Sequence, residues 1–115
     1  MAPTITIEQC IANCLRCYKV CLDTLHHCLQ QGGNHAQPNH IFMLQDCAQI
    51  CLMTADFLIR KSPNHAPLCE VCEYICNECA DDCASAKWKE DAQMAACAQM
   101  CRDCANLCKE MSEEG

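Results

Sequence analysis

Cysteine gives this sequence its greatest capacity for chemistry, since 16 of the 115 residues carry a thiol. Thiols can pair as disulfides, can fill a core as small apolar groups, or can bind soft metal ions as thiolates, with Cu(I), Zn(II) and iron–sulfur clusters as the main choices. The cysteines are Cys10, Cys14, Cys17, Cys21, Cys28, Cys47, Cys51, Cys69, Cys72, Cys76, Cys79, Cys83, Cys97, Cys101, Cys104 and Cys108.

These cysteines recur at alternating intervals of three and four residues. In the first stretch Thr24 fills the one step of this rhythm that lacks sulfur. Other residues continue the rhythm elsewhere: His40, Leu44, Thr54 and Leu58 in the second stretch, and Met94 and Met111 in the fourth. Alternation of three and four is typical of the inward-facing seam of a helix in a bundle. The sequence therefore predicts that sulfur lines a helical core.

Four helical segments must carry these seams, and we expect them over residues 6–31, 40–61, 64–86 and about 90–111. Thr6 and Gln9 are spaced as a capping box, and Gly32-Gly33 ends the first segment. The connections are so short that neighbouring helices must run antiparallel. The expected fold class is all-α: one domain, residues 1–115, forming an up-down-up-down antiparallel four-helix bundle with cysteines lining the core.

Geometry argues against two uses of the thiols. A disulfide needs Cα atoms within about 7 Å of each other, whereas packed helices lie about 8–10 Å apart, and cysteines on one helix face point alongside each other. Cysteine alone would leave voids in the core, because its side chain is much smaller than that of leucine. Bound metal ions would fill this space.

Charge separates the candidate metals. A Zn(II) ion on four thiolates keeps two negative charges, and several such sites would place uncompensated charge in a low-dielectric interior. Cu(I) on bridging thiolates can approach one ion per sulfur, about sixteen in all, and leave the core nearly neutral. The iron–sulfur spacing C-x2-C-x2-C-x3-C-P is absent. Multiple Cu(I) ions are favoured, and a zinc or general thiolate buffer of the metallothionein type is the alternative.

Composition argues against other classes of function. The formal net charge is −7 and the eight basic residues are dispersed, so we expect no nucleic-acid partner. The apolar runs are short and the opening residues lack the order of a signal peptide, so we expect no membrane span and a cytoplasmic location. A redox pair such as Cys69 and Cys72 would need a βαβ context, and no strand pattern is present. We expect no enzymatic activity.

The cysteine motifs resemble those of the cysteine-rich copper storage proteins, particularly their cytosolic branch. The motifs are CxxxCxxC at Cys10, Cys14 and Cys17 and at Cys97, Cys101 and Cys104, and CxxCxxxCxxC at Cys69, Cys72, Cys76 and Cys79. The resemblance covers nearly the whole chain. It implies a homotetramer of four-helix bundles that stores many Cu(I) ions on all sixteen cysteines and serves copper homeostasis without turnover. The second helix departs from the pattern, because only Cys47 and Cys51 carry sulfur there.

One end of the expected bundle gathers weaker soft or borderline ligands. Antiparallel order places there His26, His27, His35, His40, Met43 and Met94. The opposite end has only His65 and Met111. Imidazole and thioether bind copper more weakly than thiolate, so this end is a candidate entrance for Cu(I), with His40, Met43 and Met94 as additional ligands. The alternative is that Met fills the core and His lies at helix ends for structural reasons.

A second apolar stripe lies one position beyond the cysteine seam of the first helix. Its members are Ile11, Leu15, Tyr18, Leu22, Leu25 and Leu29, and the second helix adds Ile41, Leu52 and Ile59. The outer faces of the third and fourth helices are instead rich in Glu, Asp, Asn and Gln. We therefore expect self-association through the first two helices, with tighter packing inside one chain as the alternative. Trp88 is expected to serve packing or capping.

Overall fold

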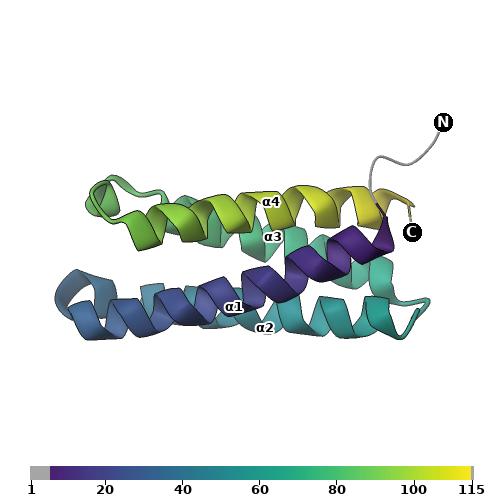
Figure 1. Ribbon diagram of the computed structural model, residues 1–115, viewed down its shortest axis with the longest axis horizontal. Helices are drawn as coiled ribbons and strands as arrows, with labels where there is room; N and C mark the ends of the chain where they lie inside the picture. Colours follow the sequence, from purple (N-terminus) through teal and green to yellow (C-terminus); the bar gives the residue numbers. More distant parts are fainter. Residues whose placement is uncertain (1–5, 115) are drawn as a thin grey trace.

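The structure, a computed structural model, describes residues 6–114, which form four α-helices and two short 3-10 turns. The helices lie side by side (Figure 1) and are α1 (Ile7–Gln31), α2 (Pro38–Ile59), α3 (His65–Cys83) and α4 (Ala92–Glu114). The turns η1 (Gly33–Ala36) and η2 (Ala86–Trp88) join α1 to α2 and α3 to α4. The predicted all-α bundle is confirmed. α2 and α3 end two to three residues before the expected positions, because their last turns pass into the connections.

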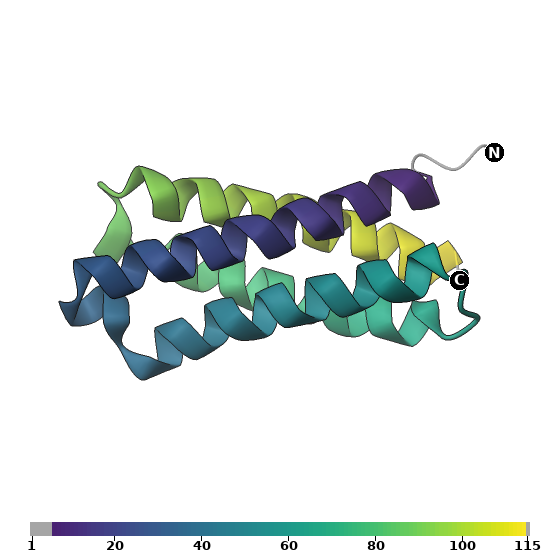
Figure 2. The ribbon, with the colours of Figure 1, turned by 60° about the horizontal axis from the view of Figure 1, so that its bottom comes forward.

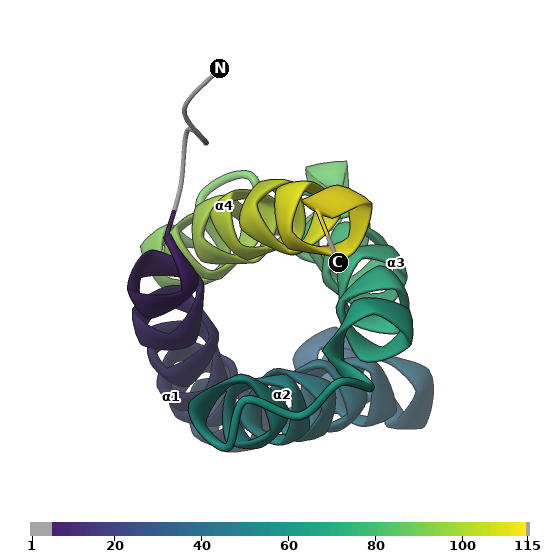
Figure 3. The same cartoon turned by 90° about the vertical axis from the view of Figure 1, so that its right-hand side faces the viewer.

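The helices form a ring around a common axis in the order α1, α2, α3, α4, and each contacts its two neighbours (Figure 3). Consecutive helices run in opposite directions (Figure 2). This up-down-up-down order brings η1 and η2 to one end of the bundle, while the start of α1 and the end of α4 lie at the other end (Figure 1). Every inward seam therefore faces the three others across one shared core.

Local sequence signals set the ends of the helices. At the start of α1, the Gln9 backbone N–H donates to Thr6 Oγ1 at 3.2 Å and the Thr6 N–H donates to Gln9 Oε1 at 2.7 Å, which is the expected capping box. Gly32 follows α1 at φ 69°, a conformation that favours glycine, and its N–H donates to the Cys28 carbonyl. At α4, Asp91 Oδ1 accepts from the Met94 N–H at 3.1 Å.

The core is made of sulfur. All sixteen cysteines are buried, with at most 2% of any residue exposed, and all are free thiols. The other predicted seam residues are buried with them: Thr24, His40, Leu44, Thr54, Leu58, Met94 and Met111. The residue directly after a seam position is a buried alanine at five places: Ala48, Ala55, Ala80, Ala98 and Ala105. These small side chains allow the helices to approach closely. The predicted cysteine-lined core is confirmed.

The apolar stripe of α1 is divided between the core and the surface. Leu15, Leu22 and Leu29 are exposed, whereas the alternating members Ile11, Tyr18 and Leu25 are half-buried against the core. On α2, Ile41 and Leu52 are half-buried and Ile59 is exposed. Two apolar side chains interrupt the polar outer face expected for α3, since Val71 and Tyr74 are 46% and 65% exposed.

The expectation that no segment could span a membrane also needs correction for one helix. α2 is long enough and apolar enough to cross a bilayer by length and composition alone. Its inward seam is buried within the bundle. The core helix of a soluble bundle passes the same test, because its seam and its outer face both carry apolar residues.

Candidate metal centre

The cysteine Sγ atoms form compact groups of four along the bundle axis. In each of five such groups, all four Sγ atoms lie within 4.8 Å of one another and all four cysteines are buried. From the end where α1 begins toward the turns η1 and η2, the groups are Cys14, Cys72, Cys104 and Cys108; Cys51, Cys72, Cys76 and Cys104; Cys17, Cys47, Cys51 and Cys76; Cys17, Cys21, Cys47 and Cys101; and Cys21, Cys79, Cys97 and Cys101. We call these twelve residues the sulfur ladder.

Each group of the ladder shares two cysteines with the next. Cys72 and Cys104 belong to the first two groups, and the same overlap recurs at every step. The Sγ–Sγ distances across the shared steps are short, for example 3.8 Å between Cys51 and Cys104 and 3.6 Å between Cys51 and Cys76. A sulfur that belongs to two groups is placed to bridge two metal ions.

Three alternate groups of the ladder share no cysteine with one another: the first, the third and the fifth. They are the places where separate tetrahedral ions of the Zn(II) type would fit. Every such ion on four thiolates leaves two negative charges in a core with no buried cation among its described residues. The ladder can thus accept either bridged monovalent ions or a few separate divalent ions, and charge favours the first.

Hydrogen bonding and burial shift the pKa values of the thiols in opposite directions. Hydrogen bonds to neighbouring sulfurs, reinforced by burial, raise the pKa of Cys51 and of Cys101. The hydrogen bond between Cys17 and Cys101 lowers the pKa of Cys17 although burial opposes it. A thiolate in this array is therefore stabilised only while its neighbours keep their protons, so the empty core cannot ionise as a whole.

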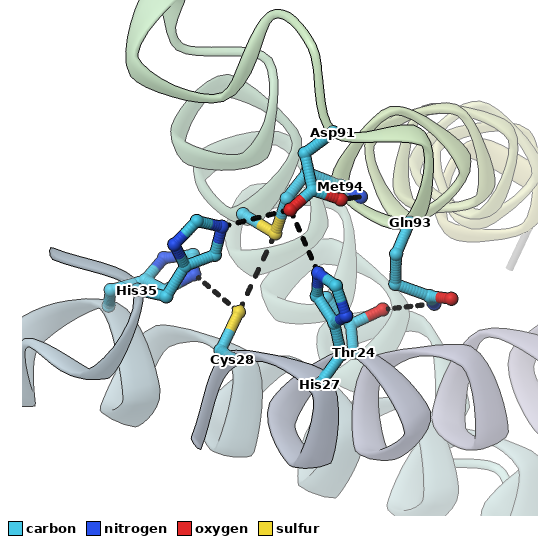
Figure 4. A network of polar contacts seen from close by, with 8 residues as sticks. Thr24, His27, Cys28, His35, Asp91, Gln93 and Met94 are labelled. Carbon is cyan, nitrogen blue, oxygen red and sulfur yellow. Dashed lines mark hydrogen bonds and ion pairs between the residues drawn. The ribbon is translucent and has the colours of Figure 1, made fainter. Parts of the chain in front are cut away.

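Cys28 stands apart from the ladder, near the two turns. Its Sγ lies 3.2 Å from His40 Nε2 and 3.6 Å from Met94 Sδ (Figure 4). All three side chains are buried, and they come from α1, α2 and α4. Burial and the negative charges of Asp91, Cys97 and Asp82 raise the pKa of Cys28 to about 11. We call Cys28, His40 and Met94 the mouth.

The His40 ring is held from two other sides. Its Nδ1 contacts Asp82 Oδ2 on α3, and a carboxylate can only accept, so Nδ1 carries the proton and Nε2 of the neutral ring turns its lone pair to Cys28. The Trp88 indole stacks on the ring with centroids 5.0 Å apart. Trp88 is 5% exposed, and its Nε1–H donates to the Asp82 carbonyl at 2.9 Å.

The other candidate ligands at this end have different positions. Met43 is half-buried and packs against the core. His26 is exposed on α1. His27 and His35 both contact Asp91. At the far end of the bundle, His65 Nδ1 lies 3.0 Å from the Ser62 carbonyl and Met111 is buried.

Three residues that contact the histidines at this end were not predicted as site residues from the sequence. Asp82 and Asp91 look like ordinary acidic residues in a chain with 15 of them, and Trp88 lies outside every seam. Their roles arise where the end of α3, η2 and the start of α4 meet the histidines of α1, η1 and α2. In the sequence, Asp91 can be recognised only as a possible N-cap residue for the last helix.

Comparison with known proteins gives one family and several similar structures. The sequence model of the copper storage protein family matches residues 4–113. A comparison with curated proteins gives no significant match.

Among solved structures, a protein from Nitrosospira multiformis is 33% identical with a TM-score of 0.83, and the match covers 95% of this chain and 96% of that one. The Cu(I)-bound copper storage protein BsCsp3 is 31% identical with a TM-score of 0.82, covering 91% and 96%. The metal-free copper storage protein 3 from Bacillus subtilis is 30% identical with a TM-score of 0.81, covering 93% and 99%. The chain, with its buried thiols, its four-helix fold and a family match over nearly its whole length, belongs to the copper storage protein family.

Proposed function

We propose that this protein stores many Cu(I) ions inside its bundle, about one per cysteine. The observation that carries the proposal is the continuous overlap of the sulfur ladder, in which each group of four Sγ atoms shares two with the next. A monovalent ion of low coordination number can occupy such an array with every thiolate bridging two ions, and the charges then nearly cancel. Storage by binding alone needs no catalytic turnover.

The competing function is a buffer for a few Zn(II) ions. The three separable groups of the ladder support that function geometrically, but twelve thiolates around divalent ions would leave several negative charges in the core. The structural similarity to a Cu(I)-bound relative supports the first proposal. Sixteen free thiols also favour a reducing compartment, so we place the protein in the cytoplasm.

The test is an anaerobic titration of the reduced, metal-free protein with Cu(I) in the presence of a competing chromogenic chelator. We expect each chain to withhold well over ten ions from the chelator, because all sixteen cysteines contribute ligands. A parallel Zn(II) titration serves as the comparison. Saturation with Cu(I) at three or four ions would match the separable groups and would replace the proposal with the Zn(II)-type buffer.

We further propose that Cu(I) enters through the mouth. His40 Nε2 and Met94 Sδ both lie within 3.6 Å of Cys28 Sγ. A thiol that can give up its proton to a metal, an imidazole nitrogen and a thioether thus meet at one place, which suits transient binding of a soft ion. A cavity of about 290 Å³ reaches His40 from outside, with Asp82, Trp88 and Asn39 among its lining residues. Met43, half-buried at the same end of the bundle, would act as a further ligand while Cu(I) passes to the cysteines.

Asp82 provides a sharp test of the mouth. In Asp82→Asn the new amide can donate to His40 Nδ1, which moves the ring proton to Nε2 and removes the lone pair that faces Cys28. Loss of such an outer carboxylate weakens a histidine ligand about 10- to 100-fold, so we expect the initial rate of Cu(I) uptake to fall by that order while capacity stays nearly unchanged.

Stopped-flow uptake measurements would check this prediction. Asp81→Asn is the matched control, because Asp81 is the neighbouring residue of α3 and pairs instead with Arg102. His40→Ala should slow uptake at least as much as Asp82→Asn. Equal uptake rates in wild type, Asp82→Asn and His40→Ala would exclude the mouth as the route.

We also propose that the protein assembles as a homotetramer through the outer faces of α1 and α2. Leu15, Leu22 and Leu29 are exposed at steps of seven along α1, which places them in one row. Phe42 and Ile59 add 57% and 56% exposed apolar side chains on α2. An apolar row on α1, with further exposed apolar side chains on the neighbouring α2, suits a partner helix better than water.

A further inference from the structure

Outside the sulfur core, three metal-binding side chains converge beside the mouth. His27 Nε2 and His35 Nε2 lie 2.8 and 2.9 Å from the same oxygen, Oδ2 of Asp91. The three residues come from α1, from η1 and from the residue that caps α4 (Figure 4). Residues far apart in the sequence thus direct two imidazole nitrogens and one carboxylate to a single point.

The chemistry of these three donors differs from that of the core. Imidazole and carboxylate are borderline to hard ligands, which prefer divalent transition ions to soft Cu(I). Two histidines, one carboxylate and a water molecule make up a common four-coordinate Zn(II) site. With metal–ligand distances of about 2.0–2.2 Å, a tetrahedral site separates its ligand atoms by roughly 3.3 Å. The two nitrogen–oxygen separations therefore need to open by only a fraction of an ångström.

Solvent can reach the cluster, and its charge state suits a cation. It lines a cavity of about 530 Å³, and the side chains of His27, His35 and Asp91 are 28%, 22% and 16% exposed. Burial raises the pKa of Asp91, but hydrogen bonds from the two histidines and from the Met94 N–H outweigh it and hold the pKa below its usual range, so the carboxylate is ionised at neutral pH. Neutral histidines can free Nε2 by moving the ring proton to Nδ1.

We propose that His27, His35 and Asp91 form a binding site for one divalent transition ion of the Zn(II) class, with water as the remaining ligand. The site is separate from the sulfur core and needs no cysteine. Lys87 and Lys89 also line the cavity, so the ion is held by its direct ligands rather than by the surrounding field. We therefore expect weaker binding than at thiolates.

The position of the site links it to the mouth. The His35 ring lies 4.5 Å from the Trp88 ring, and Trp88 stacks on His40. An ion held by α1, η1 and the start of α4 would fix η1 against Trp88. We therefore expect a bound divalent ion to slow both uptake and removal of Cu(I) without changing how many Cu(I) ions are stored.

Co(II) is the probe that tests the site, because its visible bands distinguish nitrogen and oxygen ligands from thiolate. The Cu(I)-loaded protein, whose thiols are occupied, is titrated anaerobically with Co(II) and then with Zn(II). We expect one Co(II) per chain, with visible ligand-field bands but no thiolate-to-cobalt charge transfer, and displacement by Zn(II).

Matched variants separate the site from other histidines. His27→Ala and His35→Ala should each weaken Co(II) binding at least tenfold, because each removes one of three protein ligands. His26→Ala removes an exposed histidine next to the site and should leave binding unchanged. Circular dichroism checks that each variant is folded, and if one is not, the other single variant carries the test.

The outcomes also distinguish this inference from the proposed storage function. If the protein loads Cu(I) but binds no Co(II), or if His26→Ala loses as much binding as His35→Ala, the cluster is only a structural latch and the inference is wrong. If Cu(I) loading itself fails, the titration is repeated on metal-free protein. In the metal-free protein, the difference in Co(II) binding between wild type and His35→Ala still tests the inference. It is measured from ligand-field bands that appear without thiolate-to-cobalt charge transfer.

Discussion

We expect the metal-free protein to unfold as the pH rises from about 8 to about 11, while the Cu(I)-loaded protein stays folded over the same range. In the unfolded chain every thiol ionises near pH 8.5, which is about the ordinary pKa of cysteine. The folded core resists complete ionisation, because hydrogen bonding and burial raise the pKa of thiols such as Cys51, Cys101 and Cys108, and burial raises the pKa of Cys28 to about 11. Thiols with a lowered pKa, such as Cys17, owe it to hydrogen bonds with neighbouring sulfurs that must keep their protons, so they cannot offset the cost of ionising the rest.

The direction of the effect follows from the number of protons bound. A thiol whose pKa is higher in the folded state contributes its full stability below the unfolded pKa and loses it as the pH rises through the folded pKa. Each unit of difference corresponds to about 1.4 kcal/mol, so a few such thiols together equal the roughly 5–15 kcal/mol that stabilises a typical domain. Cu(I) removes the effect, because loading has already replaced the protons.

Chemical unfolding followed by circular dichroism, at several pH values and under anaerobic reducing conditions, measures this difference. The loaded protein is the control for alkaline effects on the rest of the chain. Equal unfolding midpoints for the metal-free protein at the two ends of the pH range would contradict the prediction. They would mean that the core accommodates many thiolates at once.

Leu22→Glu should convert the assembled protein to monomers. Leu22 is 38% exposed in the single chain and lies in the middle of the α1 row, so the proposed interface would bury it. A carboxylate there has no partner, and an unpaired buried charge costs about 3–5 kcal/mol, which corresponds to a shift of more than a hundredfold in the dissociation constant. Size-exclusion chromatography with light scattering gives the mass directly.

Val71→Glu is the matched control for Leu22→Glu. Val71 is 46% exposed on α3, outside the proposed interface, so its replacement should leave the mass unchanged. Capacity for Cu(I) should be the same in both variants, because neither residue touches the sulfur seams. A monomeric wild type, or a monomer caused by Val71→Glu alone, would overturn the assignment of the interface to α1 and α2.

The fold was predictable because one local rule places nearly every buried residue. Within each helix an interval of three or four residues recurs, from Cys10 in the first to Met111 in the last, and each residue in that rhythm is buried. The same rule predicted Thr24 and Thr54 as core residues although neither has sulfur. Burial here follows from the position of a residue on the helix rather than from the type of its side chain. Family membership was predictable for the same reason.

Contacts at the bundle end were not predictable in the same way. The expected soft-ligand end is present, but the sequence does not show that Asp82 turns His40 toward Cys28 or that His27 and His35 share Asp91. These contacts depend on the paths of η1 and η2, which follow no period. The exposed Val71 and Tyr74 were missed because each is a single apolar residue on an otherwise polar face.

Trp88 is the only tryptophan in the sequence, and it stacks on His40 at the mouth. Its fluorescence therefore arises at one known place, beside the route proposed for Cu(I) and away from the sulfur ladder. Emission selected for tryptophan can follow events at that end in real time, while ultraviolet absorption by copper thiolates follows the filling of the core. The chain thus carries its own optical probe, and the order in which its two compartments respond can be observed in a single mixing experiment without any added label.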